Sequence, residues 1–275
     1  MPTSTYSHIP TVVRFLRMVM PSSILDIGLG NGKMGFIARD FLDVMLGGRH
    51  KKGDWGIKID GIEIFSEYIQ GHQKAIYDDI YTGDAFEVID RLADYDLIIL
   101  GDVLEHFKKE KAWQFLDKCT THCNYLIINI PLGEKWTQSV IYGNLHEEHL
   151  SFWRHEEFEP FVTDKELFNF PDIGYYGCLL IKKDDYIHYR IRERADALYS
   201  EGRAEEAISY MIAYLYEIAP DLKSEYVLVD LLLKELRIKD AIERLKGVVD
   251  AFPEEMSVRH YLETLREIVA KKDAK

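Results

Sequence analysis

Two kinds of hydrophobic pattern divide the chain. Up to about residue 184, short apolar runs rich in β-branched residues alternate with stretches whose apolar residues have helical spacing, which predicts an α/β sheet domain. The predicted strands are residues 24–27, 57–64, 80–82, 95–100, 125–131, 165–170 and 175–181. Beyond residue 184 only amphipathic helical patterns follow. We therefore predict two domains, residues 1–184 and residues 185–275.

Helical spacing within the first domain covers residues 8–20, a stretch from Lys33 onward and residues 108–119. The polar stretch 47–54 between the first two strands is expected to be a solvated loop.

The turn after the first strand carries glycines at alternate positions behind an acid. Its members are Asp26, Gly28, Gly30 and Gly32. A strand that enters a turn without side chains lets a ligand come close to the backbone. The helix expected from Lys33 points unpaired N–H groups and the positive end of its dipole at this turn, which favours a carboxylate or phosphate there.

A dinucleotide site is an alternative interpretation of this turn, because Gly30, Gly32 and Gly35 have the G-x-G-x-x-G spacing. These glycines, however, begin two residues into the turn. The pattern of an acid followed by glycines begins directly at the strand end, and it is therefore favoured.

Three acids follow at later strand ends. Glu63 lies near the end of the second strand, where its carboxylate can accept two hydrogen bonds from a ribose diol. Asp84, in a Gly-Asp-Ala segment, can accept a hydrogen bond from an adenine amine, and Asp102 opens a polar segment behind the central strand. Because open α/β sheets bind ligands at the carboxyl edge of their strands, these side chains indicate a binding site there.

In this order, the four features resemble the class I S-adenosylmethionine-dependent methyltransferases over residues 8–184. The resemblance implies a Rossmann-like seven-stranded sheet with helices on both faces, and a closing antiparallel hairpin at the sheet edge. It also implies S-adenosylmethionine as the cofactor. The implied contacts are Gly28, Gly30 and Gly32 at the methionine end, Glu63 at the ribose, Asp84, Ala85 and Phe86 at the adenine, and Asp102 near the sulfonium.

Each motif also has a purely structural interpretation. The glycines would fit a simple turn, and Glu63 would fit a solvated strand end. Asp84 would fit the N-cap of the next helix, and Asp102 with Glu105 would fit a charged helix start. The agreement of four motifs in order favours the methyltransferase interpretation.

Acceptor chemistry is expected from residues 133–161, which contain His146-Glu147-Glu148-His149 ahead of Phe152 and Trp153. The two histidines are three positions apart rather than four, so the zinc-protease motif is absent. Glu147 and Glu148 are expected at a solvated helix start.

The first candidate for a general base is His149, which we expect Leu150, Phe152 and Trp153 to bury on one side. Histidines in the corresponding segment act as bases in several small-molecule methyltransferases, and a packed structural histidine is the alternative. The next candidates are His146, and then Asp102 or His106. An Asn-Pro-Pro-Tyr segment, which amine methyltransferases of this family use, is absent after the fourth strand, so oxygen methylation is favoured over nitrogen or carbon acceptors.

Charge and cysteines narrow the possible partners. A net charge of -13 argues against nucleic acid and anionic membranes, since binding to both depends on clustered Lys and Arg. No apolar run reaches the ~18 residues of a membrane span. Three cysteines and no secretory signal indicate reduced thiols in the cytoplasm. Residues 119–123 lack a second ligand cluster, so no metal site is predicted.

The second domain contains an internal repeat. Residues 201–208 match residues 235–242 at an offset of 34, and this resembles tetratricopeptide repeats, with Ala207 and Ala241 where two helices approach closely. Two such units and a helix over 256–270 fall short of about three repeats. The domain is therefore expected to bind a protein partner or a second copy of the chain, or else to buttress the first domain.

Three hypotheses remain. The leading one is a methyltransferase that acts on a small-molecule or glycan hydroxyl. The alternatives are an NAD-dependent Rossmann oxidoreductase, and a non-catalytic scaffold that binds partners through its helical repeats.

Overall fold

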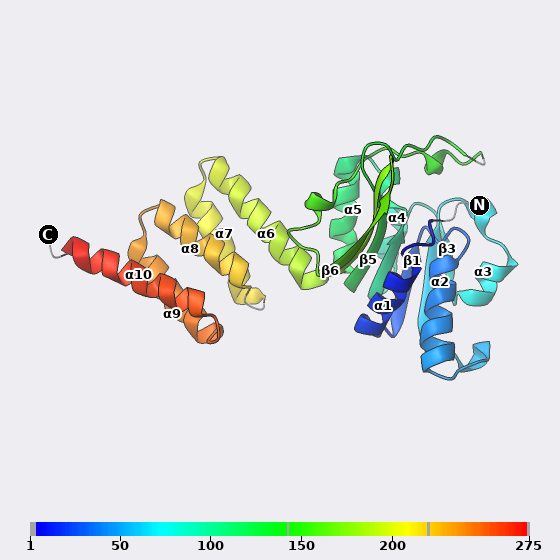
Figure 1. Ribbon diagram of the computed structural model, residues 1–275, viewed down its shortest axis with the longest axis horizontal. Coiled ribbons are helices and arrows are strands. Elements are labelled where there is room, and N and C mark those ends of the chain that lie inside the picture. The colour runs from blue at the N-terminus through cyan, green and yellow to red at the C-terminus, as the bar shows by residue number, and fades with distance from the viewer. Residues whose placement is uncertain (1–3, 142, 219–220, 274–275) are drawn as a thin grey trace. The chain divides into compact units, whose positions relative to one another are not determined.

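The computed structural model describes residues 4–141, 143–218 and 221–273, and the chain forms two compact units (Figure 1). They are Met1–Tyr186 and Ile187–Lys275, and the sequence analysis placed the boundary two residues earlier. No helix in the described part of the chain is both long and apolar enough to cross a membrane.

The first unit is built on one seven-stranded sheet with the order β3-β2-β1-β4-β5-β7-β6. The strands are β1 Ser23–Ile27, β2 Lys58–Glu63, β3 Ile80–Thr82, β4 Tyr95–Gly101, β5 Cys123–Leu132, β6 Asp164–Phe170 and β7 Gly174–Lys182. The first five are parallel, and β7 runs antiparallel to both β5 and β6. This confirms the predicted mixed sheet and the hairpin at its edge.

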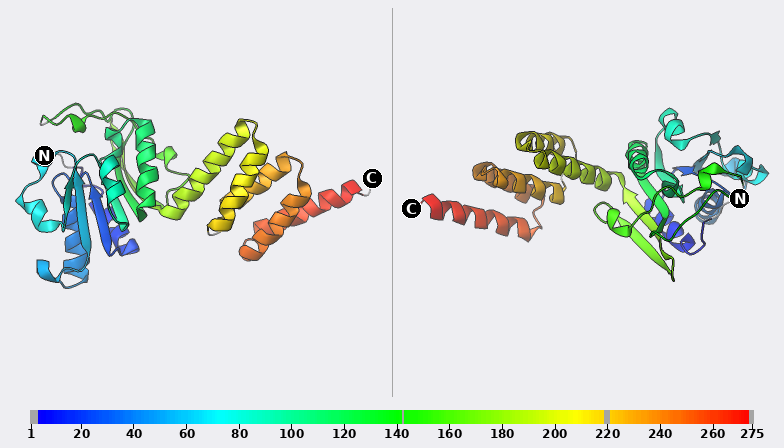
Figure 2. Two further views of the ribbon diagram at one scale, coloured as in Figure 1. Left: turned by 180° about the vertical axis from the view of Figure 1, so that it is seen from behind. Right: turned by 90° about the horizontal axis from the view of Figure 1, so that it is seen from above.

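Different helices cover the two faces of the sheet (Figure 2). Ile24 and Leu97 belong to the core cluster that includes residues of α1 (Ile9–Val19) and α2 (Lys33–Ala38). The next residue along β1, Leu25, is also fully buried, and because side chains alternate along a strand it faces the other side. On that side α5 (Lys109–Thr121) packs against β5 with Phe115 and Leu116 buried. The remaining short helices are α3 Gly71–Ile76 and α4 Ala85–Val88.

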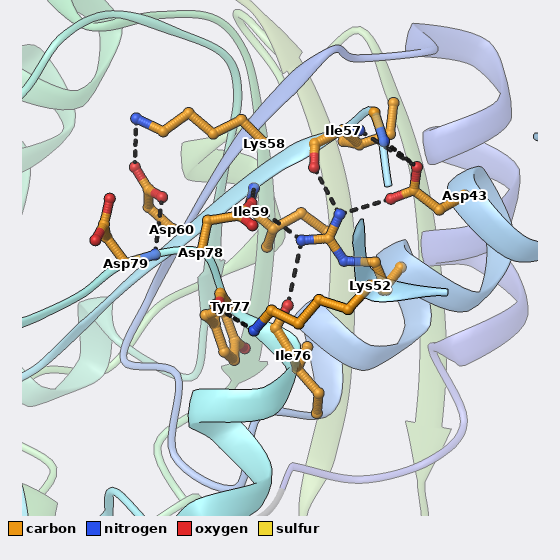
Figure 3. Close-up of polar contacts among 12 residues, drawn as sticks. Asp43, Lys52, Ile57, Lys58, Ile59, Asp60, Ile76, Tyr77, Asp78 and Asp79 are labelled. Atoms are coloured by element: carbon orange, nitrogen blue, oxygen red, sulfur yellow. Dashed lines mark hydrogen bonds and ion pairs between the residues drawn. The ribbon is translucent and has the colours of Figure 1, made fainter. Parts of the chain in front are cut away.

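The helix predicted from Lys33 continues past α2 as a wider π-helical segment, Arg39–Leu46. A buried ion network anchors it to the sheet. The Arg39 guanidinium donates to the Asp43 carboxylate at 2.6 Å and to the Ile57 carbonyl at 2.6 Å. The same Asp43 carboxylate accepts from the backbone N–H of Gly56 and of Ile57 (Figure 3). The network therefore fixes where β2 begins.

The polar loop 47–54 is mostly exposed, as predicted, yet two of its cations, Arg49 and Lys52, have structural partners. Arg49 pairs with Asp43 at 2.7 Å. Lys52 donates to the carbonyl of Tyr77 at the end of α3 (Figure 3). It also donates to the carbonyls of Lys74 and Ala75. A cation at a helix C-terminus stabilises the unpaired carbonyls there, so Lys52 stabilises the end of α3.

The second unit consists of helices with a repeat of 34 residues. The helices are α7 Ala204–Glu217, α8 Leu222–Lys234, α9 Ile238–Ala251 and α10 Met256–Asp273, each packed on the next, and α6 Lys183–Ser200 contains the boundary between the units. Both α7 and α8 begin 34 positions before α9 and α10. Ala207 and Ala241 are fully buried at equivalent positions.

The turns before α7 and α9 have the same unusual backbone. Gly202 has φ +79°, and Leu236 occupies the equivalent left-handed position with φ +58°. The second copy therefore keeps the turn although it lacks the glycine, at the steric cost that a side chain imposes there.

Candidate functional site

A cleft of about 770 Å³ lies at the carboxyl ends of β1, β2 and β4. Most of the residues predicted for the site line it, namely Asp26, Gly28, Gly30, Glu63, Asp84, Ala85, Asp102, His106, His146 and His149. Gly32 and Phe86 are not among the lining residues. The Phe86 ring, from α4, instead packs on the surface of α5, near Phe115 and with the Lys118 ammonium 4.1 Å from its centre.

A hydrogen bond joins the glycine turn to Glu63, the acid at the end of β2. The backbone N–H of Gly30 donates to Glu63 Oε2 at 3.0 Å, and the N–H of Phe65 donates to Oε1 at 2.9 Å. Glu63 is 4% exposed, and burial raises the pKa of its carboxyl although these amides oppose the shift. Gly28 has φ +70°, and a Cβ there would lie 2.8 Å from Val103, so the turn needs glycine at this position.

Asp26 supports the turn from beneath. Its carboxyl group accepts a hydrogen bond from the Tyr77 hydroxyl, which in turn accepts the N–H of Gly35 at 3.2 Å. Burial raises the pKa of Asp26 to about 7. The Tyr77 ring occupies the space that a side chain at Gly35 would need, since a Cβ there would overlap it. At Gly61 the Leu29 side chain blocks a Cβ at 2.5 Å, and the Tyr77 ring lies 3.2 Å from it.

Asp84 acts as the N-cap of α4, which was its structural interpretation. Oδ1 accepts the N–H of Phe86 at 2.9 Å, and Oδ2 pairs with Lys111 at 3.1 Å. A carboxylate has about four acceptor positions, so the cap leaves room for a further hydrogen bond from a ligand in the cleft.

Asp102 has a strained backbone at the end of β4, with φ +55° in a residue other than glycine. The Tyr176 hydroxyl donates to Oδ1 at 2.8 Å, while the buried Oδ2 has no partner. Burial raises the pKa of Asp102 to about 6, against the lowering effect of the Tyr176 hydrogen bond and of Lys33. An unsatisfied carboxylate oxygen held by a strained backbone is typical of a binding position.

Glu105 and His106, which follow β4, meet His149 of the 133–161 segment at one wall of the cleft. Among the described residues, Glu105, His106 and His149 form a group that could hold a metal ion, with one ligand atom of each within 4.8 Å of the others. The imidazole rings of His106 and His149 lie edge to face at 5.1 Å. Burial lowers the pKa of His106 to about 4. The sequence analysis did not single out Glu105 as a site residue, because nothing in the sequence shows that its carboxyl group is left without a partner.

The 133–161 segment forms another wall of the cleft. Trp136, Gln138, Ile141, Asn144, His146, Glu147, His149 and Leu150 all line it. The prediction of a solvated Glu147 was wrong, because this side chain is 6% exposed and accepts hydrogen bonds from Asn144 and Gln138, both at 3.2 Å. Glu148 is exposed, as predicted.

The expected cover of His149 was also wrong. Leu150 is 49% exposed and Phe152 is 43% exposed. Trp153 is fully buried, but it packs against Phe158 at 5.3 Å and beneath the Lys109 ammonium. The aromatic ring that lies against His149 is the imidazole of His106.

No protein-family model matches this chain, and no curated protein matches it. Among solved structures, it is similar to the N-terminal domain of EvdMO1 in the presence of SAH and D-fucose, at 11% identity over 66% of this chain and 84% of that one, with a TM-score of 0.45. A putative O-methyltransferase from Nostoc punctiforme is 21% identical over 63% of this chain, with a TM-score of 0.44, and the match spans 55% of that protein. The methyltransferase domain of bacterial CtHen1-C is 18% identical over 64% of this chain and 96% of that one, with a TM-score of 0.42. With identities and TM-scores this low, the function has to be inferred from the chain's own residues.

Proposed function

We propose that the first unit is an S-adenosylmethionine-dependent methyltransferase acting on a hydroxyl group of a small molecule or glycan. Gly28 and Gly30 would hold the methionine end of the donor, Glu63 its ribose and Asp84 its adenine. The unpaired oxygen of Asp102 would face the positive end of the molecule.

The bond from the Gly30 N–H to Glu63 is the observation that carries this proposal. A dinucleotide places its pyrophosphate on the backbone amides of such a turn. Here a carboxylate already occupies the amide, and a second anion beside it would be repelled. The cleft lining of the described residues contains six carboxyl groups, of Asp26, Glu63, Asp84, Asp102, Glu105 and Glu147, against the lysines at 33, 108 and 111, although burial raises the pKa of four of the six, at 26, 63, 102 and 105. This excess favours a cationic donor over NAD.

The chemistry of the donor asks little of the protein beyond position and charge. When bound, S-adenosylmethionine supplies a methyl group on a positive sulfur: the acceptor oxygen bonds to this carbon, the carbon–sulfur bond breaks with its electron pair left on sulfur, and the hydroxyl proton leaves to a base. The candidate bases that line this cleft are His149, His146, His106 and Asp102. The 133–161 segment walls this region of the cleft, and a wall that excludes water would favour an in-line displacement.

Calorimetric titration of the full chain with S-adenosylmethionine, S-adenosylhomocysteine and NAD tests the proposal. We expect the first two to bind one per chain and NAD not to bind. Glu63→Gln should weaken both by roughly 10- to 150-fold, because a charged hydrogen bond contributes about 1.5–3 kcal/mol. The matched control is Glu67→Gln, which changes an exposed acid outside the cleft. Binding of NAD alone, or equal affinity in the Glu63 variant, would refute the assignment.

For the second unit, we propose a tetratricopeptide-repeat-like role in binding a protein partner or a second copy of the chain. The 34-residue offset between equivalent helices and the buried Ala207 and Ala241 support it. Light scattering of the full chain at several concentrations tests for self-association. A chain that is monomeric at all concentrations would exclude the second copy, and the proposed partner would then be a different protein.

A further inference from the structure

The cluster of Glu105, His106 and His149 has the make-up of a metal site, and we propose that it binds one divalent first-row transition ion. One ligand atom from each side chain lies within 4.8 Å of the others. The sequence predicts no metal site, because residues 119–123 lack a second ligand cluster and the zinc-protease spacing is absent. These ligands come from two segments more than 40 residues apart, so their spacing in the sequence gives no signal.

Each of the two histidines bonds to a backbone carbonyl through Nδ1, which leaves Nε2 as the nitrogen for a metal ion. His106 Nδ1 lies 3.0 Å from the backbone carbonyl of Glu148, and His149 Nδ1 lies 2.8 Å from the backbone carbonyl of Trp136. A carbonyl oxygen only accepts, so each Nδ1 carries the proton and each Nε2 keeps its lone pair. Metal-binding histidines are usually oriented in this way, with the second ring nitrogen donating to a carbonyl or carboxylate.

Glu105 supplies the charge that an ion would neutralise. Its side chain is 1% exposed, and neither Oε1 nor Oε2 has a hydrogen-bond partner. A buried carboxylate without a partner is costly, and a protonated carboxyl group would still leave its O–H without an acceptor. A bound cation removes this cost. The unpaired Oδ2 of Asp102 adds a second negative group to the same cleft.

The ligand set indicates the class of ion. Two imidazole nitrogens and one carboxylate oxygen suit Mn²⁺, Fe²⁺, Co²⁺ or Zn²⁺, whereas Mg²⁺ and Ca²⁺ prefer oxygen ligands alone. Three protein ligands leave coordination positions open, as in catalytic metal sites. All three residues line the cleft, so a bound molecule can reach those positions.

The role of this ion rests on the proposed function. A hydroxyl of the acceptor would occupy an open position, and the ion would lower its pKa so that the proton passes to water at neutral pH. His149 is then a ligand and not the general base.

Equilibrium dialysis of the chelator-treated full chain against Co²⁺ tests the binding directly. We expect one Co²⁺ per chain, with visible absorption bands of the bound ion, and little displacement by excess Mg²⁺. Glu105→Gln and His149→Gln should each weaken binding at least about 100-fold. The matched control His155→Gln changes a histidine of the same segment that lies outside the cleft lining, and it should bind Co²⁺ like the unchanged chain.

Tryptophan fluorescence during urea unfolding establishes that each variant is folded. If the unchanged chain binds no Co²⁺, or if both ligand variants bind it as well as the control, the site does not exist. If Mg²⁺ displaces Co²⁺ at equal concentration, the ion class is wrong. Titration with S-adenosylhomocysteine separates this inference from the proposed function: donor binding without Co²⁺ binding refutes only the metal site, and Co²⁺ binding without donor binding refutes only the methyltransferase.

Discussion

His8 allows a quantitative test of the first unit through the pH dependence of its stability. The side chain is fully buried against the Tyr176 ring at 5.1 Å, and neither ring nitrogen has a hydrogen-bond partner. Burial, assisted by the charge of Lys33, lowers the pKa of His8 from 6.5 to about 4. The unfolded chain therefore takes up a proton at higher pH than the folded chain does.

The sign and size of the effect follow from these two pKa values. Between pH 6.5 and 4 the unfolded state binds more protons, so the free energy of unfolding falls as the pH falls through this range. The full loss is about 3 kcal/mol, of which about 1.4 kcal/mol appears between pH 7.5 and pH 5.5. His8→Phe keeps an aromatic ring against Tyr176 and cannot titrate. The unfolding free energy of wild type minus that of the variant should therefore fall by about 1.4 kcal/mol between the two pH values.

Urea unfolding followed by tryptophan fluorescence measures this difference for the first unit alone. All four tryptophans belong to that unit, at positions 55, 113, 136 and 153. Burial raises the pKa of Asp26 and of Asp102, which makes the first unit more stable as the pH falls, but both groups remain in the variant and cancel in the subtraction. His50→Phe, at an exposed position, is the control. A wild-type minus His8→Phe difference that stays constant within about 0.3 kcal/mol would refute the reasoning.

Three further substitutions test other parts of the structure. Leu236→Gly should stabilise the second unit by about 0.5–1 kcal/mol in far-UV circular dichroism melts, because glycine relieves the left-handed backbone and loses only part of this gain to the entropy of the unfolded chain; lower stability would contradict this. Asp43→Asn should lower the unfolding free energy of the first unit by about 3 kcal/mol, since it leaves the buried guanidinium of Arg39 without its closest carboxylate, and a loss below about 1 kcal/mol would show that the pair is not important. Gly28→Ala should abolish binding of S-adenosylhomocysteine in calorimetry, because the added Cβ would lie 2.8 Å from the Val103 side chain. The control Gly53→Ala places its Cβ in open space and should bind normally, and retained affinity in Gly28→Ala would show that the turn adapts.

The sheet and its binding edge were predictable because their determinants are local. Largely apolar runs such as residues 95–100 predict buried strands, and the glycines and acids directly behind the strands predict the edge at which they meet. The 34-residue repeat was visible for the same reason, since equivalent positions such as Ala207 and Ala241 have the same small side chain.

The other features of the site depend on contacts between distant segments. Glu147 follows a polar run that indicates solvent, yet hydrogen bonds from Asn144 and Gln138 bury it. Glu105 is unusual because its buried carboxyl oxygens have no hydrogen-bond partner, and the absence of a partner cannot be seen in a sequence. The widening of the helix after α2 changes backbone hydrogen bonding without changing the hydrophobic period, so periodicity does not reveal it.

The two histidines are both held by the backbone of one segment. The carbonyls of Trp136 and Glu148, which hold the imidazoles, belong to the same segment that walls the cleft, and the N–H groups of Leu150 and Ser151 tether that segment to the carbonyl of Glu105. A displacement of this segment would release His106 from the carbonyl of Glu148 and would move His149 with the backbone. The positions of both imidazoles, and so the geometry of the Glu105, His106 and His149 cluster, therefore depend on the backbone of this one segment.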